Sequence, residues 1–178
     1  MLFDFEKFTA KHAARQMSAQ RLEDRQRDVY ESHRHRVFSL SYYMSGSEIE
    51  AEDLLRETFV AAFRRAIDPD QGTVDAALVD QLTDHLLLEE TEFVPVPTSA
   101  LLPQRRNILR ADLEEAIRCL PPKERLIFLL MDMEGYPAAR IASLLEMTES
   151  AVSRTAVVAR MRLRHELANA REDGCQAA

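Results

Sequence analysis

The sequence predicts an all-α protein of two small helical domains joined by an acidic linker that contains proline. Apolar residues recur at spacings of three and four through most of the chain, as they do on the buried face of a helix. Glycine and proline interrupt this pattern, and three prolines fall within residues 89–107. We therefore expect one domain over residues 1–88, a linker over 89–107, a second domain over 108–169 and a polar tail over 170–178.

The composition is typical of a compact protein that folds in water. Of the 178 residues, 46% are hydrophobic and 30% are charged, and the net charge is −7. No apolar run approaches the ~20 residues of a membrane span, and residues 1–7 lack the basic start and apolar core of a signal peptide. Cys119 is expected on an apolar helix face and Cys175 in the polar tail, which does not suggest a disulfide framework. These features predict a cytoplasmic protein.

Catalytic and metal-binding patterns are absent from the sequence. His33 and His35 are two residues apart on an expected helix, so they face different directions, and no Cys-x-x-Cys or His-x-x-x-His pair accompanies them. The chain has four glycines and carries no Gly-x-Ser-x-Gly motif, phosphate loop or dinucleotide fingerprint. We therefore expect a protein that is not an enzyme, with no catalytic residues, no metal site and no cofactor.

The first domain is expected to contain helices over residues 28–44, 48–67 and 74–88, after a charged lead-in. Gly46 ends the first of these helices, and Ser47 suits the N-cap of the second. A turn containing proline and glycine separates the second helix from the third. The expected apolar face of the second helix comprises Ala51, Leu54, Leu55, Thr58, Phe59, Ala62 and Ala66.

The second domain is expected to be a helix-turn-helix unit preceded by one further helix. Pro122 suits the first position of a helix that ends at Gly135, where glycine reaches the left-handed conformation of a C-terminal cap. Pro137 opens a short helix, which is followed by a turn at Glu146 and Met147. The residues expected inside this unit are Leu109, Leu113, Ile117, Leu120, Leu126, Ile127, Leu129, Leu130, Met133, Ile141, Ala142, Leu144 and Leu145.

The last helix has the pattern of a recognition helix. Thr148 is a suitable N-cap, and Val152, Ala156, Ala159 and Leu163 recur at helical spacing on one side. The opposite side is where such a helix meets the major groove of DNA. Val157 and Val158 fit either a surface that faces a protein or packing against the helix over residues 109–119. The residues expected to point outward at the front of the helix are Ser150, Ser153, Arg154 and Val157.

Two blocks of sequence carry a resemblance to a known family. The first block is YESHRHRVF over residues 30–38 with AEDLLRETF over 51–59. The second is LPPKER over 120–125 with IASLL over 141–145 and AVSR over 151–154. The first block is similar to the first half of region 2, and the second to region 4, of bacterial RNA polymerase sigma factors of the extracytoplasmic-function group. The blocks stand in the order that the family has, and the run over 51–59 is the more specific of the motifs.

The resemblance implies two binding surfaces. In the family, the charged face of the helix over residues 48–67 docks on the clamp helices of the largest polymerase subunit, which implies core-polymerase binding by Glu52, Asp53, Arg56 and Glu57. Composition alone favours a solvated face, stabilised by pairs such as Glu52 with Arg56, and the match to the family motif reverses that preference. The helix-turn-helix unit would bind promoter DNA at a minus-35 element through Thr148, Ser150, Ser153 and Arg154. A possible further partner is an anti-sigma factor.

The segment from Ala66 to Ala100 departs from the family. In sigma factors this stretch holds the helix that recognises and melts the minus-10 element, and Ala77, Asp80 and Asp84 stand where a tryptophan, a basic residue and an asparagine are usual. An acidic surface opposes contact with the phosphate backbone. The segment has no lysine or arginine, and its acidic residues are Asp68, Asp70, Asp75, Asp80, Asp84, Glu89, Glu90 and Glu92.

The sequence therefore predicts a sigma factor that binds core RNA polymerase and directs it to promoters. The acidic segment favours one alternative, a sigma-like mimic that binds an anti-sigma factor or polymerase without melting DNA. A second alternative is a dimeric helix-turn-helix repressor. Residues 120–167 contain seven basic and six acidic residues, a weak charge for a protein that binds DNA by itself.

The composition of the linker generates the first testable prediction. Three prolines and a cluster of acidic residues within 89–107 are typical of an extended connection, so limited proteolysis should cut the full chain between about Glu89 and Arg106. Two folded fragments are the expected products, and mass spectrometry locates the cuts. Resistance of this segment to a protease that cleaves the unfolded chain would contradict the predicted division into two domains.

Overall fold

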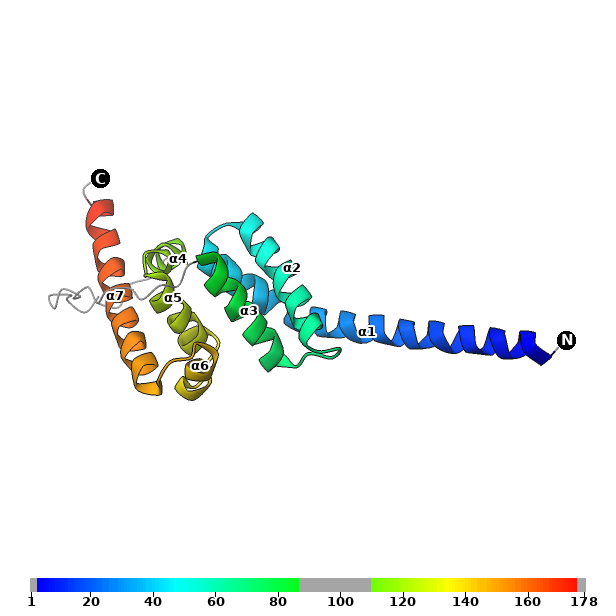
Figure 1. The fold of residues 1–178 in the computed structure, drawn as a ribbon. Helices are drawn as coiled ribbons and strands as arrows, with labels where there is room; N and C mark the ends of the chain where they lie inside the picture. The colour runs from blue at the N-terminus through cyan, green and yellow to red at the C-terminus, as the bar shows by residue number, and fades with distance from the viewer. Residues whose placement is uncertain (1–2, 87–109, 176–178) are drawn as a thin grey trace.

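The computed structural model describes residues 3–86 and 110–175, and within those ranges all regular structure is helical, which confirms the predicted all-α class. Burial is described for residues 16–85 and 110–168. The expected linker and its two boundaries lie within residues 87–109, outside the described residues. The elements in order are α1 (Phe3–Ser45), α2 (Glu48–Arg65), α3 (Gln71–Leu86), α4 (Arg110–Arg118), α5 (Pro122–Phe128), the π-helical η1 (Leu129–Met133), α6 (Ala138–Leu144) and α7 (Glu149–Cys175) (Figure 1).

In the described part of the chain, no helix combines the length and the apolar character needed to cross a membrane.

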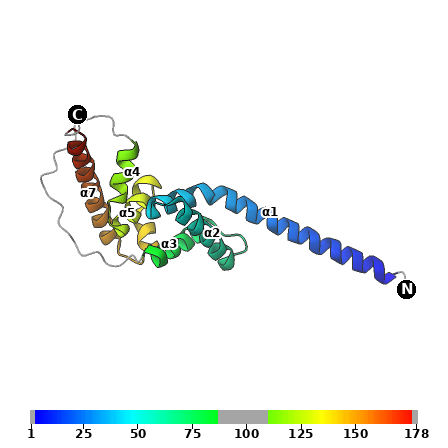
Figure 2. The same ribbon diagram turned by 90° about the horizontal axis from the view of Figure 1, so that it is seen from above.

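Helix α1 is one continuous helix from Phe3, where the sequence predicted a lead-in followed by a helix from residue 28. No glycine or proline lies between residues 3 and 45, so nothing in the sequence breaks the helix. Its N-terminal half extends away from the other helices in both views (Figures 1 and 2). The C-terminal half packs on α2 and α3 through Val37, Leu40 and Met44, which are buried.

Helices α1, α2 and α3 form the first unit, and α4, α5, η1, α6 and α7 form the second. The turns of the first unit follow from their cap residues. Gly46 has a φ of 75°, and the Ser47 hydroxyl accepts a hydrogen bond of 3.4 Å from the Glu50 N–H at the start of α2, as predicted. Asp70 caps α3 by accepting bonds of 2.8 Å from the Thr73 N–H and 2.7 Å from its hydroxyl. This cap was not predicted, and it starts α3 at Gln71 where the sequence predicted Val74.

The second unit contains the predicted helix-turn-helix with one unpredicted π-helical turn. In η1 the Glu134 N–H donates to the Leu129 carbonyl, five residues earlier, at 3.0 Å. The extra residue in this turn moves Met133 outward to 47% exposure, so its predicted place in the buried stripe is wrong. Gly135, with a φ of 71°, ends the segment as predicted.

Helix α4 is shorter than predicted, and Pro137 is the N-cap of α6 where the sequence predicted its first residue. Leu113 within α4 is 37% exposed, and Cys119, which follows the end of α4 at Arg118, is exposed. Their predicted places on an apolar face are therefore corrected. Helix α7 has the predicted buried side, and it continues to Cys175 where a polar tail was expected.

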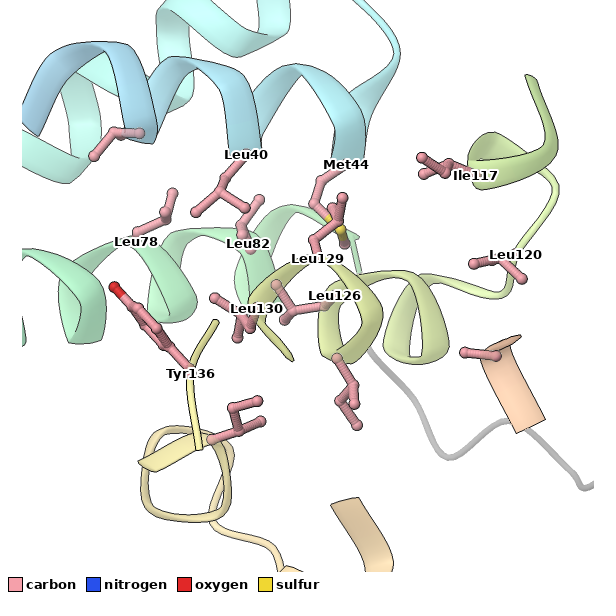
Figure 3. Close-up of a cluster of buried hydrophobic side chains, with 14 of the residues drawn as sticks. Leu40, Met44, Leu78, Leu82, Ile117, Leu120, Leu126, Leu129, Leu130 and Tyr136 are labelled. Atoms are coloured by element: carbon pink, nitrogen blue, oxygen red, sulfur yellow. The ribbon is translucent and has the colours of Figure 1, made fainter. Parts of the chain in front are cut away.

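The two units share one hydrophobic core. Helix α1 contacts α4 and α5, and α3 contacts α6. Figure 3 shows Leu40 and Met44 of α1 with Leu78 and Leu82 of α3 on one side, facing the α5 and η1 segment on the other. Leu129 lies at the centre of this contact with no exposed surface. Since each buried leucine contributes about 1.5–3 kcal/mol, this contact is a major part of the stability.

The second testable prediction compares two residues of η1. Leu129→Ala should lower the free energy of unfolding by about 2–5 kcal/mol, because it leaves a cavity where the two units meet. Met133→Ala, at a position that is 47% exposed, should change it by less than about 0.5 kcal/mol. Urea titration followed by circular dichroism measures both values. Equal losses in the two variants would contradict the π-helical register of this segment.

Candidate protein and nucleic-acid interfaces

A groove of about 780 Å³ lies between α1 and α2. The rings of Tyr30 and Phe59 are 4.8 Å apart between centroids, and those of Phe59 and Phe63 are 6.1 Å apart. Charged side chains share the groove with these rings, so it offers both apolar and ionic contacts to a partner. The residues that line it are Gln26, Tyr30, Glu52, Asp53, Leu55, Arg56, Phe59, Val60, Phe63 and Arg64.

The groove collects three of the four residues that the sequence assigned to polymerase binding. Glu52, Asp53 and Arg56 line it, and Arg56 Nη2 lies 2.7 Å from Asp53 Oδ1. This pair replaces the Glu52–Arg56 pair expected for a solvated helix. Glu57 does not line the groove, since its Oε2 lies 2.8 Å from Nε2 of His85 on α3. The aromatic lining was not predicted, because it depends on how α1 packs against α2.

The predicted DNA-contacting residues come together at the front of α7. Ser150, Ser153 and Arg154 are exposed, and within the described residues Arg154 makes no hydrogen bond or ion pair. Thr148 is also exposed, but its hydroxyl accepts a 3.2 Å bond from the Ala151 N–H and lies 3.2 Å from the Ser150 hydroxyl. Thr148 is thus the N-cap of α7, as predicted, and this hydroxyl already has an intramolecular partner.

Two basic residues of α7 are engaged within the second unit. The guanidinium of Arg160 contacts both carboxylate oxygens of Asp132 at 2.9–3.1 Å. Arg162 Nε lies 3.0 Å from Glu124 Oε2, and burial raises the pKa of this carboxyl, although the arginine opposes the shift. These pairs hold α7 against α5 and η1. The basic surface of the helix that is free to meet DNA is therefore smaller than the sequence suggests.

Three of the described acidic residues after α2, namely Asp70, Asp75 and Asp80, have structural partners. Asp70 caps α3, and Asp80 forms an ion pair with Arg65 of α2. Ala77, at the position where the family has tryptophan, has no exposed surface. This position therefore faces the core and cannot stack on a base. Glu89, Glu90 and Glu92 lie outside the described residues.

Asp75 is the acidic residue whose role sequence reasoning missed. Its side chain is 2% exposed, with Oδ1 at 2.6 Å from Arg36 Nη1 of α1 and Oδ2 at 2.5 Å from Arg140 Nη2 of α6. The Tyr136 hydroxyl donates a 2.7 Å bond to Oδ2. Burial raises the pKa of Tyr136, and the hydrogen bond to Asp75 raises it further. No local pattern signals this cluster, because its members come from both units.

The chain matches two models of one family in the family's own order. Sigma-70 region 2 matches residues 29–76, and sigma-70 region 4 matches residues 110–163. The first match covers α2 and ends within α3, and the second contains the helix-turn-helix. The chain therefore belongs to the sigma-70 family.

Similarity to individual proteins narrows this assignment. The chain is 30% identical to the ECF RNA polymerase sigma factor SigE of Mycolicibacterium smegmatis, over 85% of this chain and 65% of the length of that protein. Within the family it is a member of the extracytoplasmic-function group. It is also similar to a chain in the 1.8 Å structure of an RsbN–BldN complex, with 22% identity over 79% of this chain and 89% of the other. The TM-score of 0.32 is too low to establish a common fold.

Proposed function

We propose that this protein is a non-enzymatic transcription initiation factor of the cytoplasm that binds core RNA polymerase and directs it to promoter DNA. One observation carries the proposal: both sigma-70 regions are present in order, and each presents a surface suited to its partner. Region 2 offers the groove between α1 and α2, and region 4 offers the front of α7. The two surfaces belong to different units.

The groove supports the polymerase contact by its chemistry. An amphipathic helix of a partner would place apolar side chains against Tyr30, Phe59 and Phe63 and charged ones against the residues at the edge. Asp53 and Arg56 are half or more exposed, so their ion pair opens at little cost when a partner offers another one. We therefore assign core binding to Glu52, Asp53 and Arg56, and to Glu57 through its position beside them.

The front of α7 supports contact with a minus-35 element. The exposed Ser150, Ser153 and Arg154 are suited to hydrogen bonds with base edges, and Arg154 is free to pair with guanine. Because Arg160 and Arg162 are engaged within the unit, the free protein has little charge for phosphate binding. We infer that polymerase supplies most of the affinity for promoter DNA.

A second candidate function is favoured by α3. This helix carries Asp80 and Asp84 on its exposed side and a buried alanine where a base-stacking ring is usual in the family. Such a helix suits a sigma-like mimic that binds polymerase or an anti-sigma factor without melting DNA. Run-off transcription with purified core enzyme distinguishes the two functions. A specific transcript supports the initiation factor, whereas core binding without any transcript from a set of genomic promoters supports the mimic.

The third testable prediction concerns the polymerase surface. Asp53→Lys together with Glu57→Lys should weaken binding to core polymerase by about fivefold to thirtyfold, which corresponds to roughly 1–2 kcal/mol for lost charge pairs at an interface. The melting temperature should change little, because both carboxylates are about half exposed. Fluorescence anisotropy with labelled protein measures the affinity.

A matched control for this variant carries Glu31→Lys and Glu115→Lys. It makes the same change in net charge at two exposed carboxylates that do not line the groove. Its affinity for core polymerase should stay within about twofold of the original protein, since the altered charges lie outside the proposed contact. Full affinity in the Asp53 and Glu57 variant, or an equal loss in both, would contradict the assignment of the groove.

The fourth testable prediction asks whether α7 reads sequence. Arg154→Ala should weaken binding of the holoenzyme to a minus-35 duplex by about 1–3 kcal/mol, and its binding to random duplex much less. Arg164→Ala, at an exposed position further along α7, should weaken both about equally. Electrophoretic mobility shift with the two duplexes gives the ratio of the holoenzyme's affinity for the minus-35 duplex to its affinity for the random duplex. If neither variant alters promoter affinity, the helix-turn-helix unit serves as a scaffold.

A further inference from the structure

The contact between the two units contains a buried cluster of charges. Asp75 of α3 is nearly inaccessible and faces two guanidinium groups, from Arg36 of its own unit and Arg140 of the other. The Tyr136 hydroxyl joins them, since it accepts a 2.8 Å bond from Arg36 Nη1 and a 2.9 Å bond from Gln71 Nε2. The Arg140 guanidinium also lies 4.0 Å from the centroid of the Tyr136 ring. A buried carboxylate is energetically unfavourable unless cations and hydrogen-bond donors surround it, as they do here.

A second polar contact closes the other end of the interface. Arg125 of α5 donates a 2.7 Å hydrogen bond to the Met44 carbonyl at the end of α1 and a 2.9 Å bond to the Leu120 carbonyl. It also donates to the Arg118 carbonyl of α4. Between the two polar ends lie the leucines of Figure 3. The interface therefore has an apolar centre with directional contacts at both ends, as a specific association requires.

The cluster engages a side chain that is placed to meet DNA. In a helix-turn-helix unit the first helix crosses the DNA backbone while the second enters the major groove. Arg140 lies on that first helix, α6, and its side chain is 36% exposed. A guanidinium pairs with carboxylate and phosphate oxygens in the same geometry. Asp75 therefore binds the Arg140 guanidinium that would otherwise be available to a phosphate of the DNA backbone.

We propose that the arrangement seen here is an autoinhibited closed form of the free protein, in which Asp75 holds region 4 against region 2 and competes with DNA phosphate for Arg140. The part of this inference that concerns promoters rests on the proposed function. The closed form itself does not, because the contacts lie within the chain. Opening exposes Arg140 and the side of α3 that faces α6, and a partner that binds only the open form shifts the population toward it.

The first experiment measures DNA binding by the free chain. Asp75→Asn should raise its affinity for a random 20-base-pair duplex by about threefold to tenfold, and the dependence of log affinity on log salt should steepen by roughly one phosphate contact. Asp80→Asn is the matched control, because it removes one negative charge from the exposed side of the same helix. Equal affinities in the two variants would overturn the proposal.

A double variant tests whether Arg140 is the group released. In Asp75→Asn with Arg140→Gln, the gain in affinity and the steeper salt dependence should both disappear. Arg140→Gln alone should leave the weak binding of the original protein within about twofold, because Asp75 already occupies this side chain. A gain that persists in the double variant would show that some other group contacts the phosphate, which overturns the competition.

The distance between the units provides a readout that does not involve DNA. Ile49→Cys on α2, outside the groove, and Met161→Cys on α7, both exposed, can carry dyes for single-molecule energy transfer after Cys119→Ser and Cys175→Ser. The free protein should give one compact population. Asp75→Asn should increase the extended fraction by about tenfold, and Asp80→Asn should leave it unchanged. A broad distribution in the original protein, or no difference between the variants, would overturn the closed form.

A second variant of the cluster guards against an effect of misfolding. If Asp75→Asn lowers the thermal stability of the chain, Tyr136→Phe serves as the second variant, because it removes only the hydroxyl of the cluster. It should also increase the extended fraction, by a smaller amount than Asp75→Asn. An unchanged distance between the dyes in folded Tyr136→Phe and folded Asp75→Asn would overturn the proposal.

Addition of core polymerase should extend the labelled protein. Failure of polymerase to bind at all would contradict the proposed function, while the variant comparison would still decide the closed form.

Discussion

The burial of α3 between two sets of helices is the constraint on which the rest of the structure depends. Leu78 and Leu82 lie in the core that α1 and α3 share with α5 and η1, so both units are needed to cover them. A carboxylate within such an interface is unfavourable without cations, and Asp75 therefore requires Arg36 from one unit and Arg140 from the other. Apolar burial supplies most of the attraction, and the carboxylate specifies which faces meet.

This packing divides the surface into available and occupied parts. The groove between α1 and α2 and the front of α7 remain open to partners, whereas one side of α6 and one side of α3 are covered. Arg160 and Arg162 are likewise engaged with carboxylates inside the second unit. A region 4 with few free cations and a region 2 with an acidic helix would bind DNA poorly by themselves, which fits a factor that acts as part of a larger assembly.

The fold could be predicted wherever the chemistry is local. Gly46, Ser47, Gly135 and Thr148 mark helix ends through their own conformational or hydrogen-bonding preferences, and the structure uses each as predicted. The π-helical turn, the outward position of Met133 and the exposure of Leu113 and Cys119 were not predicted, because they depend on neighbours far along the chain. The same holds for the sites. The charged residues of α2 follow from a motif, whereas the aromatic lining of the groove and the role of Asp75 exist only once separate helices pack together.

The π-helical turn makes this region sensitive to chain length as well as to residue type. An α-helix advances by roughly 100° per residue, so the additional residue in η1 sets the angle at which the chain leaves toward Tyr136 and α6. Deletion of one residue between Leu129 and Met133 would restore a regular α-helix and rotate everything that follows by about that angle. The Tyr136 hydroxyl would then point away from Asp75, and the helix-turn-helix would lose its packing contact with α3. Among relatives of this chain, variation in this turn should therefore take the form of substitutions far more often than of insertions or deletions.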